Sequence, residues 1–141
     1  GVSPSQIELE ITGRVLIREE SGCEDQIARL RQLGFGIALD DFGTGYSSLS
    51  YLRRFKVDRL KLDRTFALNA EINESVAIVR AAVGLAHSMG LEVVAEGIET
   101  KLQERVAFEA GCDAVQGNLY ALPMTARVFA DYLESRSSAA A

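Results

Sequence analysis

The sequence predicts an α/β fold built on a parallel sheet. Short apolar runs alternate with longer segments of helical periodicity, which is typical of repeated βα units. Each apolar run also carries a polar residue at or near its C-terminal end. Five strands are expected, and they cover Ile7–Ile11, Gly36–Asp40, Arg59–Leu62, Glu92–Glu96 and Asp113–Gln116.

Helix signals separate the predicted strands. Two pairs have the spacing of a capping box, in which each side chain satisfies a free amide of the first turn: Ser21 with Glu24, and Thr100 with Gln103. Three glycines stand where helices should end, because glycine adopts the left-handed conformation without strain: Gly34, Gly90 and Gly111.

The longest predicted helix lies between Asn73 and Gly90. Its apolar residues recur at steps of three and four, which predicts that this face packs against the sheet: Val76, Val79, Val83 and Ala86. A further helix is expected over Thr125–Glu134. We expect one domain over residues 1–134 and a disordered tail over residues 135–141.

Composition indicates an ordinary globular domain. The chain has 141 residues, of which 48% are hydrophobic and 25% charged, within the usual range for soluble proteins. No apolar run approaches the roughly 18 residues of a membrane span. We therefore expect no direct membrane insertion and a cytoplasmic location, either free or as the cytoplasmic part of a membrane-anchored protein.

The charge pattern argues against binding to long nucleic acids. The formal net charge is −5, and the lysines and arginines are spread along the chain, whereas phosphate neutralisation needs clustered cations. A phosphate-ester ligand would need another source of positive charge. A divalent cation held by carboxylates can supply it.

Cysteine and histidine chemistry is not expected. Cys23 and Cys112 have no second cysteine or histidine at metal-ligand spacing, so we interpret both as reduced structural residues. His87 falls inside an Ala/Val-rich helical pattern. A packing or surface role is favoured for it over a catalytic one.

Polar side chains mark the C-terminal ends of all five predicted strands: Glu10, Asp40 with Asp41, Lys61, Glu96 and Gln116. Each one taken alone could be a solvated strand end or a helix cap. In β/α barrels, however, the carboxyl ends of the strands form the site of chemistry. Because carboxylates gathered without a cation are costly, the set favours a compact acidic site.

The stretch Asp40-Asp41-Phe42-Gly43-Thr44-Gly45-Tyr46-Ser47-Ser48 is the most informative motif. Adjacent aspartates at a strand end can give oxygens to two neighbouring divalent ions, and the glycines allow a tight loop beside them. A kinase is excluded because no Gly-rich loop, Val-Ala-Ile-Lys strand or His-Arg-Asp segment accompanies the Asp-Phe-Gly. No Gly-Lys-Ser/Thr follows, so the stretch is not a P-loop.

With these residues in place, the chain resembles the EAL-domain family, bacterial phosphodiesterases that hydrolyse cyclic di-GMP. The resemblance covers nearly the whole chain and rests on five motifs in the family's order. They are Leu9-Glu10-Ile11-Thr12, the Asp-Asp-Phe-Gly-Thr-Gly-Tyr-Ser-Ser stretch, Leu60-Lys61-Leu62-Asp63, Val94-Ala95-Glu96-Gly97-Ile98-Glu99-Thr100 and Gln116-Gly117-Asn118-Leu119-Tyr120-Ala121-Leu122-Pro123.

The resemblance implies a role for each matched residue. Glu10, Asp40 and Asp41 would be ligands of one or two Mg²⁺ or Mn²⁺ ions. Lys61 would stand beside the attacking water and the scissile phosphate, and Glu96 would orient or deprotonate that water. Gln116 would help hold the metal and water cluster, and Tyr120 and Pro123 would contact a guanine. Glu99 follows Glu96 by three residues and precedes a predicted helix, so its position favours either a supporting role near the site or a role at the helix start.

The sequence departs from the family in two ways. The Glu-Ala-Leu motif and the region of the family's asparagine ligand are absent, so the resemblance implies a (β/α) barrel of the TIM type that is incomplete here by about three units. Gly13 stands where the family has an acidic residue that braces the loop after Asp41. Glycine has no side chain with which to brace it.

Two functions follow from the resemblance. The first is metal-dependent hydrolysis of cyclic di-GMP to linear pGpG by the parent domain, with the isolated chain inactive. The alternative is a degenerate, non-catalytic domain that acts as a nucleotide receptor or a protein-interaction module. Open sheet edges predict homodimerisation or marginal stability, and further domains of a larger signalling protein are expected as partners.

Overall fold

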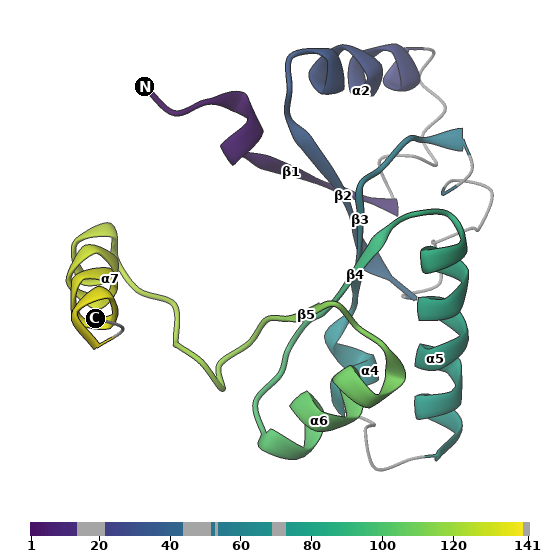
Figure 1. Ribbon diagram of the computed structural model, residues 1–141. Coiled ribbons are helices and arrows are strands. Elements are labelled where there is room, and N and C mark those ends of the chain that lie inside the picture. Colours follow the sequence, from purple (N-terminus) through teal and green to yellow (C-terminus); the bar gives the residue numbers. More distant parts are fainter. Residues whose placement is uncertain (14–21, 44–51, 53, 69–72, 140–141) are drawn as a thin grey trace.

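The computed structural model describes residues 1–13, 22–43, 52, 54–68 and 73–139 (Figure 1). Its five strands are all parallel and lie in sequence order across one sheet. They are β1 (Glu8–Thr12), β2 (Gly36–Phe42), β3 (Arg59–Leu62), β4 (Glu92–Ala95) and β5 (Ala114–Val115). The predicted α/β fold is confirmed, and the described sheet is not closed.

Helices connect the strands and cover the sheet. A 3-10 turn, η1 (Pro4–Gln6), precedes β1, and the helices are α2 (Cys23–Gln32), α4 (Arg64–Leu68), α5 (Asn73–Ser88), α6 (Lys101–Ala110) and α7 (Ala126–Ala139). Figure 1 shows α5 standing along one side of the sheet, whereas α7 stands apart from the sheet and the other helices. Among the described residues, no helix has the length and apolar composition that a membrane span requires.

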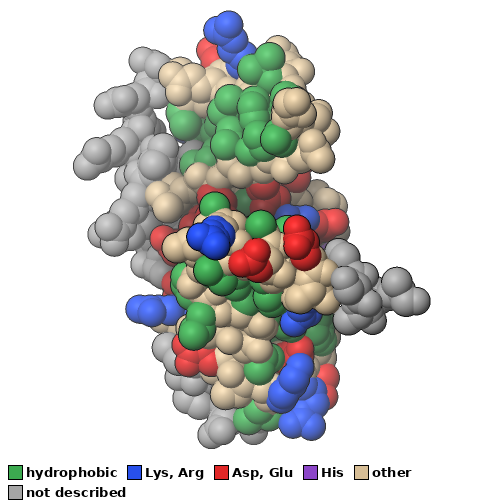
Figure 2. All heavy atoms as spheres, turned by 90° about the vertical axis from the view of Figure 1, so that its left-hand side faces the viewer, with side chains coloured by type: hydrophobic (Ala, Val, Ile, Leu, Met, Phe, Trp, Pro, Cys, Tyr) green, Lys and Arg blue, Asp and Glu red, His purple; other side chains and the backbone are tan. Residues whose placement is uncertain are grey.

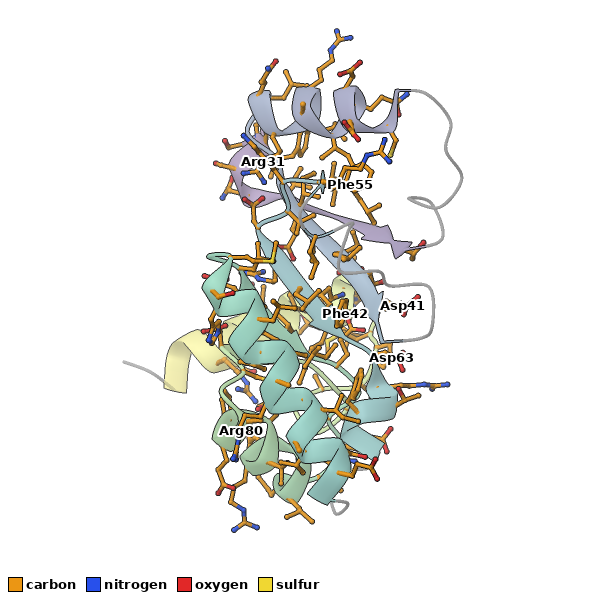
Figure 3. The ribbon with its side chains drawn as sticks, turned by 90° about the vertical axis from the view of Figure 1, so that its right-hand side faces the viewer. Arg31, Asp41, Phe42, Phe55, Asp63 and Arg80 are labelled. Atoms are coloured by element: carbon orange, nitrogen blue, oxygen red, sulfur yellow. The ribbon has the colours of Figure 1, made fainter. Side chains whose placement is uncertain are left out.

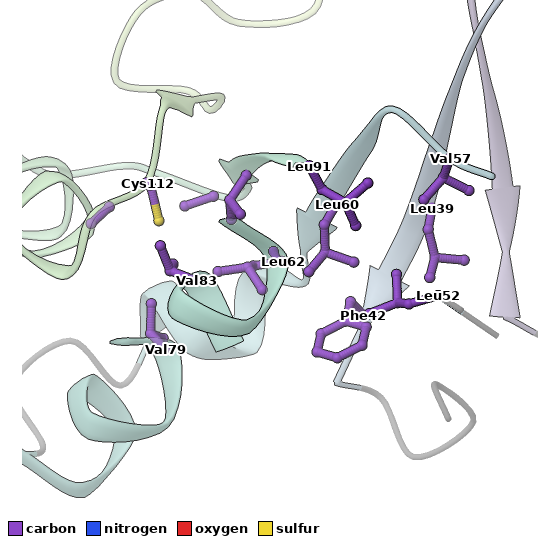
Figure 4. Close-up of a cluster of buried hydrophobic side chains, with 14 of the residues drawn as sticks. Leu39, Phe42, Leu52, Val57, Leu60, Leu62, Val79, Val83, Leu91 and Cys112 are labelled. Atoms are coloured by element: carbon purple, nitrogen blue, oxygen red, sulfur yellow. The ribbon is translucent and has the colours of Figure 1, made fainter. Parts of the chain in front are cut away.

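The core lies between the sheet and its helices (Figure 4). Strands β2, β3 and β4 supply side chains that are almost fully buried: Ile37, Leu39, Leu60, Leu62 and Val93. From α5, Val79, Val83 and Ala86 complete this core, which confirms that the predicted face packs against the sheet. Val76, at the start of the same face, is only half-buried.

Helix ends follow the predicted signals in most places. Thr100 and Gln103 form the predicted capping box of α6, and Gly34, Gly90 and Gly111 all have positive φ just after a helix. The start of α2 differs from the prediction. Its N-cap is Gly22, while Ser21 lies outside the described residues. Glu24 instead pairs with Arg54.

The predicted end of the last helix was wrong. Helix α7 continues to Ala139, five residues beyond Glu134. Two contacts hold the extension: the guanidinium of Arg136 lies 4.9 Å from the centre of the Tyr132 ring, and the Ser135 hydroxyl donates to the carbonyl of Tyr132 at 2.8 Å. Alanine at position 139, where α7 ends, also has a high helix propensity. The division at residue 134 stays a prediction.

Two loops at the C-terminal ends of β4 and β5 are joined through Ile98. Its amide donates to the carbonyl of Gln116 at 3.1 Å, and its carbonyl accepts from the amide of Leu119 at 3.0 Å. Gly117 lies so close that a Cβ there would overlap backbone atoms of Ile98. Only glycine therefore fits at this position without moving the backbone.

We predict that Gly117→Ala destabilises the fold by about 2 kcal/mol or more, because an inserted methyl group must displace packed backbone. Gly84→Ala is the matched control, since a Cβ at this position of α5 meets open space and alanine is favoured in a helix by roughly 0.5–1 kcal/mol. Thermal unfolding followed by circular dichroism checks both values. Equal stability of the two variants would contradict the assignment of a close approach at Gly117.

Candidate active site

A bulge in β2 places two aspartates opposite one lysine. Leu39 pairs with Leu60 and Phe42 pairs with Leu62, so Asp40 and Asp41 together face Lys61. Asp41 has a φ of 55°, in the left-handed region that non-glycine residues rarely adopt. Such bulges redirect side chains next to functional sites, and this one sits at the C-terminal end of the strand.

Lys61 lies at the centre of the candidate site. It is the only charged or polar residue that is buried in the described part of the chain, with 4% exposure. Its ammonium pairs with Glu10 of β1, with Glu96 at 2.6 Å and with Asp40 at 3.7 Å. Four predicted site residues from three strands and the end of a fourth are therefore brought together.

The environment keeps Lys61 positively charged. Burial alone would lower its pKa, but hydrogen bonds to Glu10 and Glu96 and the charges of Glu96 and Asp40 raise the pKa above the ordinary lysine value. The group is an ammonium throughout the physiological pH range. It supplies fixed positive charge at the carboxyl ends of the strands.

The pKa of Glu96 is also raised, but here burial is the main cause of the increase. Burial raises its pKa, and the nearby charges of Asp40 and Glu10 add to the increase, while Lys61 opposes it. A carboxyl group with a raised pKa is better suited to accept a proton near neutral pH. Raised carboxyl pKa values beside a charge cluster are also a general mark of functional sites.

The backbone around Glu96 is tightly packed. Its amide donates to the carbonyl of Leu62 at 3.1 Å, which fixes the end of β4 against β3. The next residue, Gly97, has a φ of 69°, and a Cβ there would overlap the side chain of Arg64. Glycine is required here for both reasons, so the direction of the chain after Glu96 is set by α4.

The carboxylates fit a hard divalent cation by donor type. Asp40 Oδ1 is buried, and it accepts no hydrogen bond from the residues that the structure describes; it lies 3.7 Å from the Lys61 ammonium. Carboxylate oxygens are the ligands that Mg²⁺ and Mn²⁺ prefer. Within the described ranges, no group of three or more carboxylate, cysteine or histidine side chains is close enough to enclose a metal ion. The predicted metal-ligand roles of Glu10, Asp40 and Asp41 therefore stay predictions.

Other predicted site residues lie at the surface. Gln116 and Pro123 are exposed. The amide of Glu99 donates to the Gln103 side chain at 2.7 Å, which places Glu99 at the start of α6. The Tyr120 hydroxyl donates to Glu104 at 2.6 Å, a bond that raises the pKa of the phenol. No described contact joins these residues to Lys61.

Asp63 was missed as a candidate. It follows β3 directly, and its carboxylate accepts from the amide of Thr65 at 2.9 Å. Burial opposes ionisation, yet the hydrogen bonds from Thr65 and the charge of Arg64 lower its pKa. Figure 3 shows Asp63 and Asp41 at the same end of the sheet. An aspartate between a strand and a helix is a recognisable N-cap signal.

Gly13 follows β1 and is buried. The loop that an acidic residue at this position was expected to brace continues past Gly43 into residues 44–51. These residues lie outside the described part of the chain, so the predicted effect of Gly13 stays a prediction.

The fold and the charged cluster together define an α/β protein of the TIM-barrel type with its candidate site at the carboxyl ends of the strands. The EAL domain family model matches residues 1–123, so the chain belongs to the EAL-domain family. The predicted resemblance is confirmed.

Three relatives illustrate the similarity. RocR, a cyclic di-GMP phosphodiesterase of Pseudomonas aeruginosa, is 41% identical over 130 residues, which are 92% of this chain and 33% of RocR. The structure of the PaMucR phosphodiesterase in complex with c-di-GMP has a TM-score of 0.82 and 39% identity, over 91% of this chain and 52% of that one. A manganese and c-di-GMP complex of Klebsiella pneumoniae BlrP1 has a TM-score of 0.79 and 35% identity, over 84% of this chain and 31% of that one. This chain spans only part of each relative.

We predict that Lys61→Met lowers stability at pH 7 by about 3 kcal/mol, because it leaves carboxylates gathered without their cation. Lys61 lowers the pKa of Glu96, so its loss raises that pKa and the folded variant binds more protons than the wild type. The deficit in stability is therefore small at pH 4 and grows as the pH rises above the ordinary glutamate value of 4.5. Urea unfolding at both pH values measures it.

Lys101→Met is the matched control for Lys61→Met. Lys101 pairs with Glu104 on the surface of α6, and its side chain is 75% exposed. Removing such a pair costs about 0.5 kcal/mol or less. Equal effects of the two substitutions would contradict a central role for Lys61.

Proposed function

We propose that this chain is the C-terminal part of a domain that hydrolyses cyclic di-GMP to linear pGpG. The observation that carries the proposal is the buried Lys61 ammonium, held between Glu10, Asp40 and Glu96. The cyclic di-GMP phosphodiesterase named among the relatives supports the substrate. In this reaction the P–O3′ bond breaks, which leaves a 5′-phosphate and a 3′-hydroxyl.

In the proposed reaction, Glu10, Asp40 and Asp41 hold one or two divalent cations, Mg²⁺ or Mn²⁺, together with ligands that precede this chain in its parent. Such cations lower the pKa of a bound water and neutralise the phosphate. The manganese complex of BlrP1 supports this cofactor class.

Glu96 is the proposed proton acceptor. Its raised pKa matches the task of taking a proton from the attacking water. Lys61 places its ammonium 2.6 Å from the Glu96 carboxylate, where it orients that carboxylate and adds positive charge beside the phosphate. Supporting roles for Gln116 and Glu99, and guanine contacts by Tyr120 and Pro123, complete the proposal.

A second candidate function is nucleotide binding without turnover. One observation in its favour is Gly13, which offers no side chain to the loop after Asp41. Another is that Lys61 already pairs with three carboxylates and so neutralises part of their charge without a metal ion. Calorimetry on the full-length protein separates the two functions. Tight binding of cyclic di-GMP without a metal ion and without product supports the receptor.

The wider setting belongs to the same proposal. We infer a cytoplasmic location, other domains of a larger signalling protein as partners, and association between copies of the chain. Exposed hydrophobic side chains support this association: Val2 and Ile7 precede β1, and Leu122, Val128 and Phe129 lie in the C-terminal segment. Figure 2 shows the face turned away from α5, where hydrophobic side chains gather beside acidic ones.

We predict that the isolated chain self-associates, because β1 and β5 leave unpaired strand edges on the described sheet and open edges pair with other chains. Multi-angle light scattering over a range of concentrations measures the mass. A well-folded monomer at high concentration would contradict the prediction.

We predict that Glu96→Gln in the full-length protein lowers kcat by about 10²–10⁴-fold, the usual contribution of a positioned general base, while binding of cyclic di-GMP is retained. Glu109→Gln, an exposed carboxylate on α6, is the control and keeps wild-type activity. Chromatographic detection of pGpG with Mg²⁺ or Mn²⁺ measures the rate. Absence of product from the wild-type protein at high concentration would reject the phosphodiesterase proposal.

A further inference from the structure

Helix α4 and the turn that leads into it lie between the two aspartates of β2 and Glu96 at the end of β4. On one side, the three atoms nearest to a side chain placed at Gly43 all belong to the ring of Phe66. Gly43 follows the bulge that presents Asp40 and Asp41, and it has a φ of 103°. The ring therefore rests directly against the backbone that leaves the two aspartates.

On the other side, Phe66 packs against the hydrophobic core. Phe66 and Glu96 both line an apolar cavity of about 20 Å³, which is room for roughly one water molecule. Val79 of α5 and Val106 of α6 lie around the same cavity. Phe66 thus lines a cavity that Glu96 also lines, and its ring supports the bulge.

Backbone contacts hold this turn in place from both directions. The amide of Asp63 donates to the carbonyl of Phe42 at 3.3 Å, and the amide of Glu96 donates to the carbonyl of Leu62 at 3.1 Å. The Asp63 carboxylate caps the following turn through the amide of Thr65. Phe66 is therefore presented by a rigid segment rather than by a free loop.

We propose that Phe66 is a positioning residue that sets the distance between the aspartate bulge and Glu96. Its ring acts through Gly43 on the backbone of Asp40 and Asp41, while helix α4, which carries Phe66, packs through Arg64 against Gly97 beside Glu96. The proposal rests on the phosphodiesterase function proposed above for its kinetic consequence. Its structural consequence, the geometry of the carboxylates, can be read from metal binding alone.

The test uses the full-length protein with three variants: Phe66→Ala, Phe66→Leu and Val106→Ala. Val106→Ala is the matched control, because it removes methyl groups from the same cavity and Val106 contributes none of the atoms nearest to Gly43. Calorimetric titration with Mn²⁺ in the absence of nucleotide gives metal affinity. Steady-state kinetics give kcat and KM, and thermal unfolding reports stability.

The expected result separates positioning from packing. Phe66→Ala weakens Mn²⁺ binding and lowers kcat by about 10–100-fold each, as is usual for residues that orient ligands from outside, while KM changes by less than about threefold. Phe66→Leu restores part of both and binds Mn²⁺ about three- to tenfold more weakly than the wild type. Val106→Ala loses stability but retains wild-type Mn²⁺ affinity and kcat.

Three results would overturn the assignment to Phe66: wild-type Mn²⁺ affinity in Phe66→Ala, equal losses of affinity in Phe66→Ala and Val106→Ala, or wild-type affinity in Phe66→Leu. Should Phe66→Ala fail to fold, Phe66→Leu decides alone. If the wild-type protein binds Mn²⁺ but forms no product, the phosphodiesterase function is rejected. The Mn²⁺ affinities of the variants then still test the role of Phe66. A wild-type protein that binds no Mn²⁺ rejects both.

Discussion

A buried ammonium surrounded by carboxylates is the interaction on which the site depends. Neither partner is stable in the interior alone, because an unpaired buried charge is strongly unfavourable. The parallel sheet resolves this by ending each strand at the same edge. Glu10 and Asp40 therefore reach Lys61 from the side of β1 and β2, and Glu96 reaches it from the side of β4. The order of the strands in the sheet therefore determines which carboxylates can pair with Lys61.

Close backbone packing is the second constraint. It fixes the positions of the loops that follow the strands, and with them the positions of the carboxylates. Glycine at position 97 lets the chain turn against Arg64, and glycine at position 117 lets the next loop press on Ile98. The short helix α4 contacts Gly97 through Arg64 and Gly43, after the β2 bulge, through Phe66. Displacing α4 would remove support from both Glu96 and the aspartates and change the distance between them, which is why Phe66 matters although it carries no charge.

Periodicity alone predicted much of this arrangement. Strand ends in a parallel sheet must meet at one edge, so the convergence of Glu10, Asp40, Lys61 and Glu96 follows from the sequence pattern. The bulge could not be predicted, since it depends on the register of β2 against β3. The role of Phe66 could not be predicted either, because an aromatic residue after a strand resembles any core residue in the sequence. Only the structure shows that its ring packs against Gly43. The end of α7 was missed because the contact between Arg136 and Tyr132 adds to weak local preferences.

The local charge explains how an acidic chain could take an anionic substrate in the proposed function. Glu10, Asp40, Asp41 and Glu96 bring four negative charges, and Lys61 brings one positive charge, so the cluster carries −3 when all are ionised. One divalent cation would leave −1, which still repels a cyclic dinucleotide with its two phosphodiester charges. A second would leave +1, which attracts it. For the residues of this chain alone, the charge balance favours two cations over one. Because the cluster without metal carries −3, it also predicts that nucleotide binding depends on metal, which disfavours the metal-free receptor.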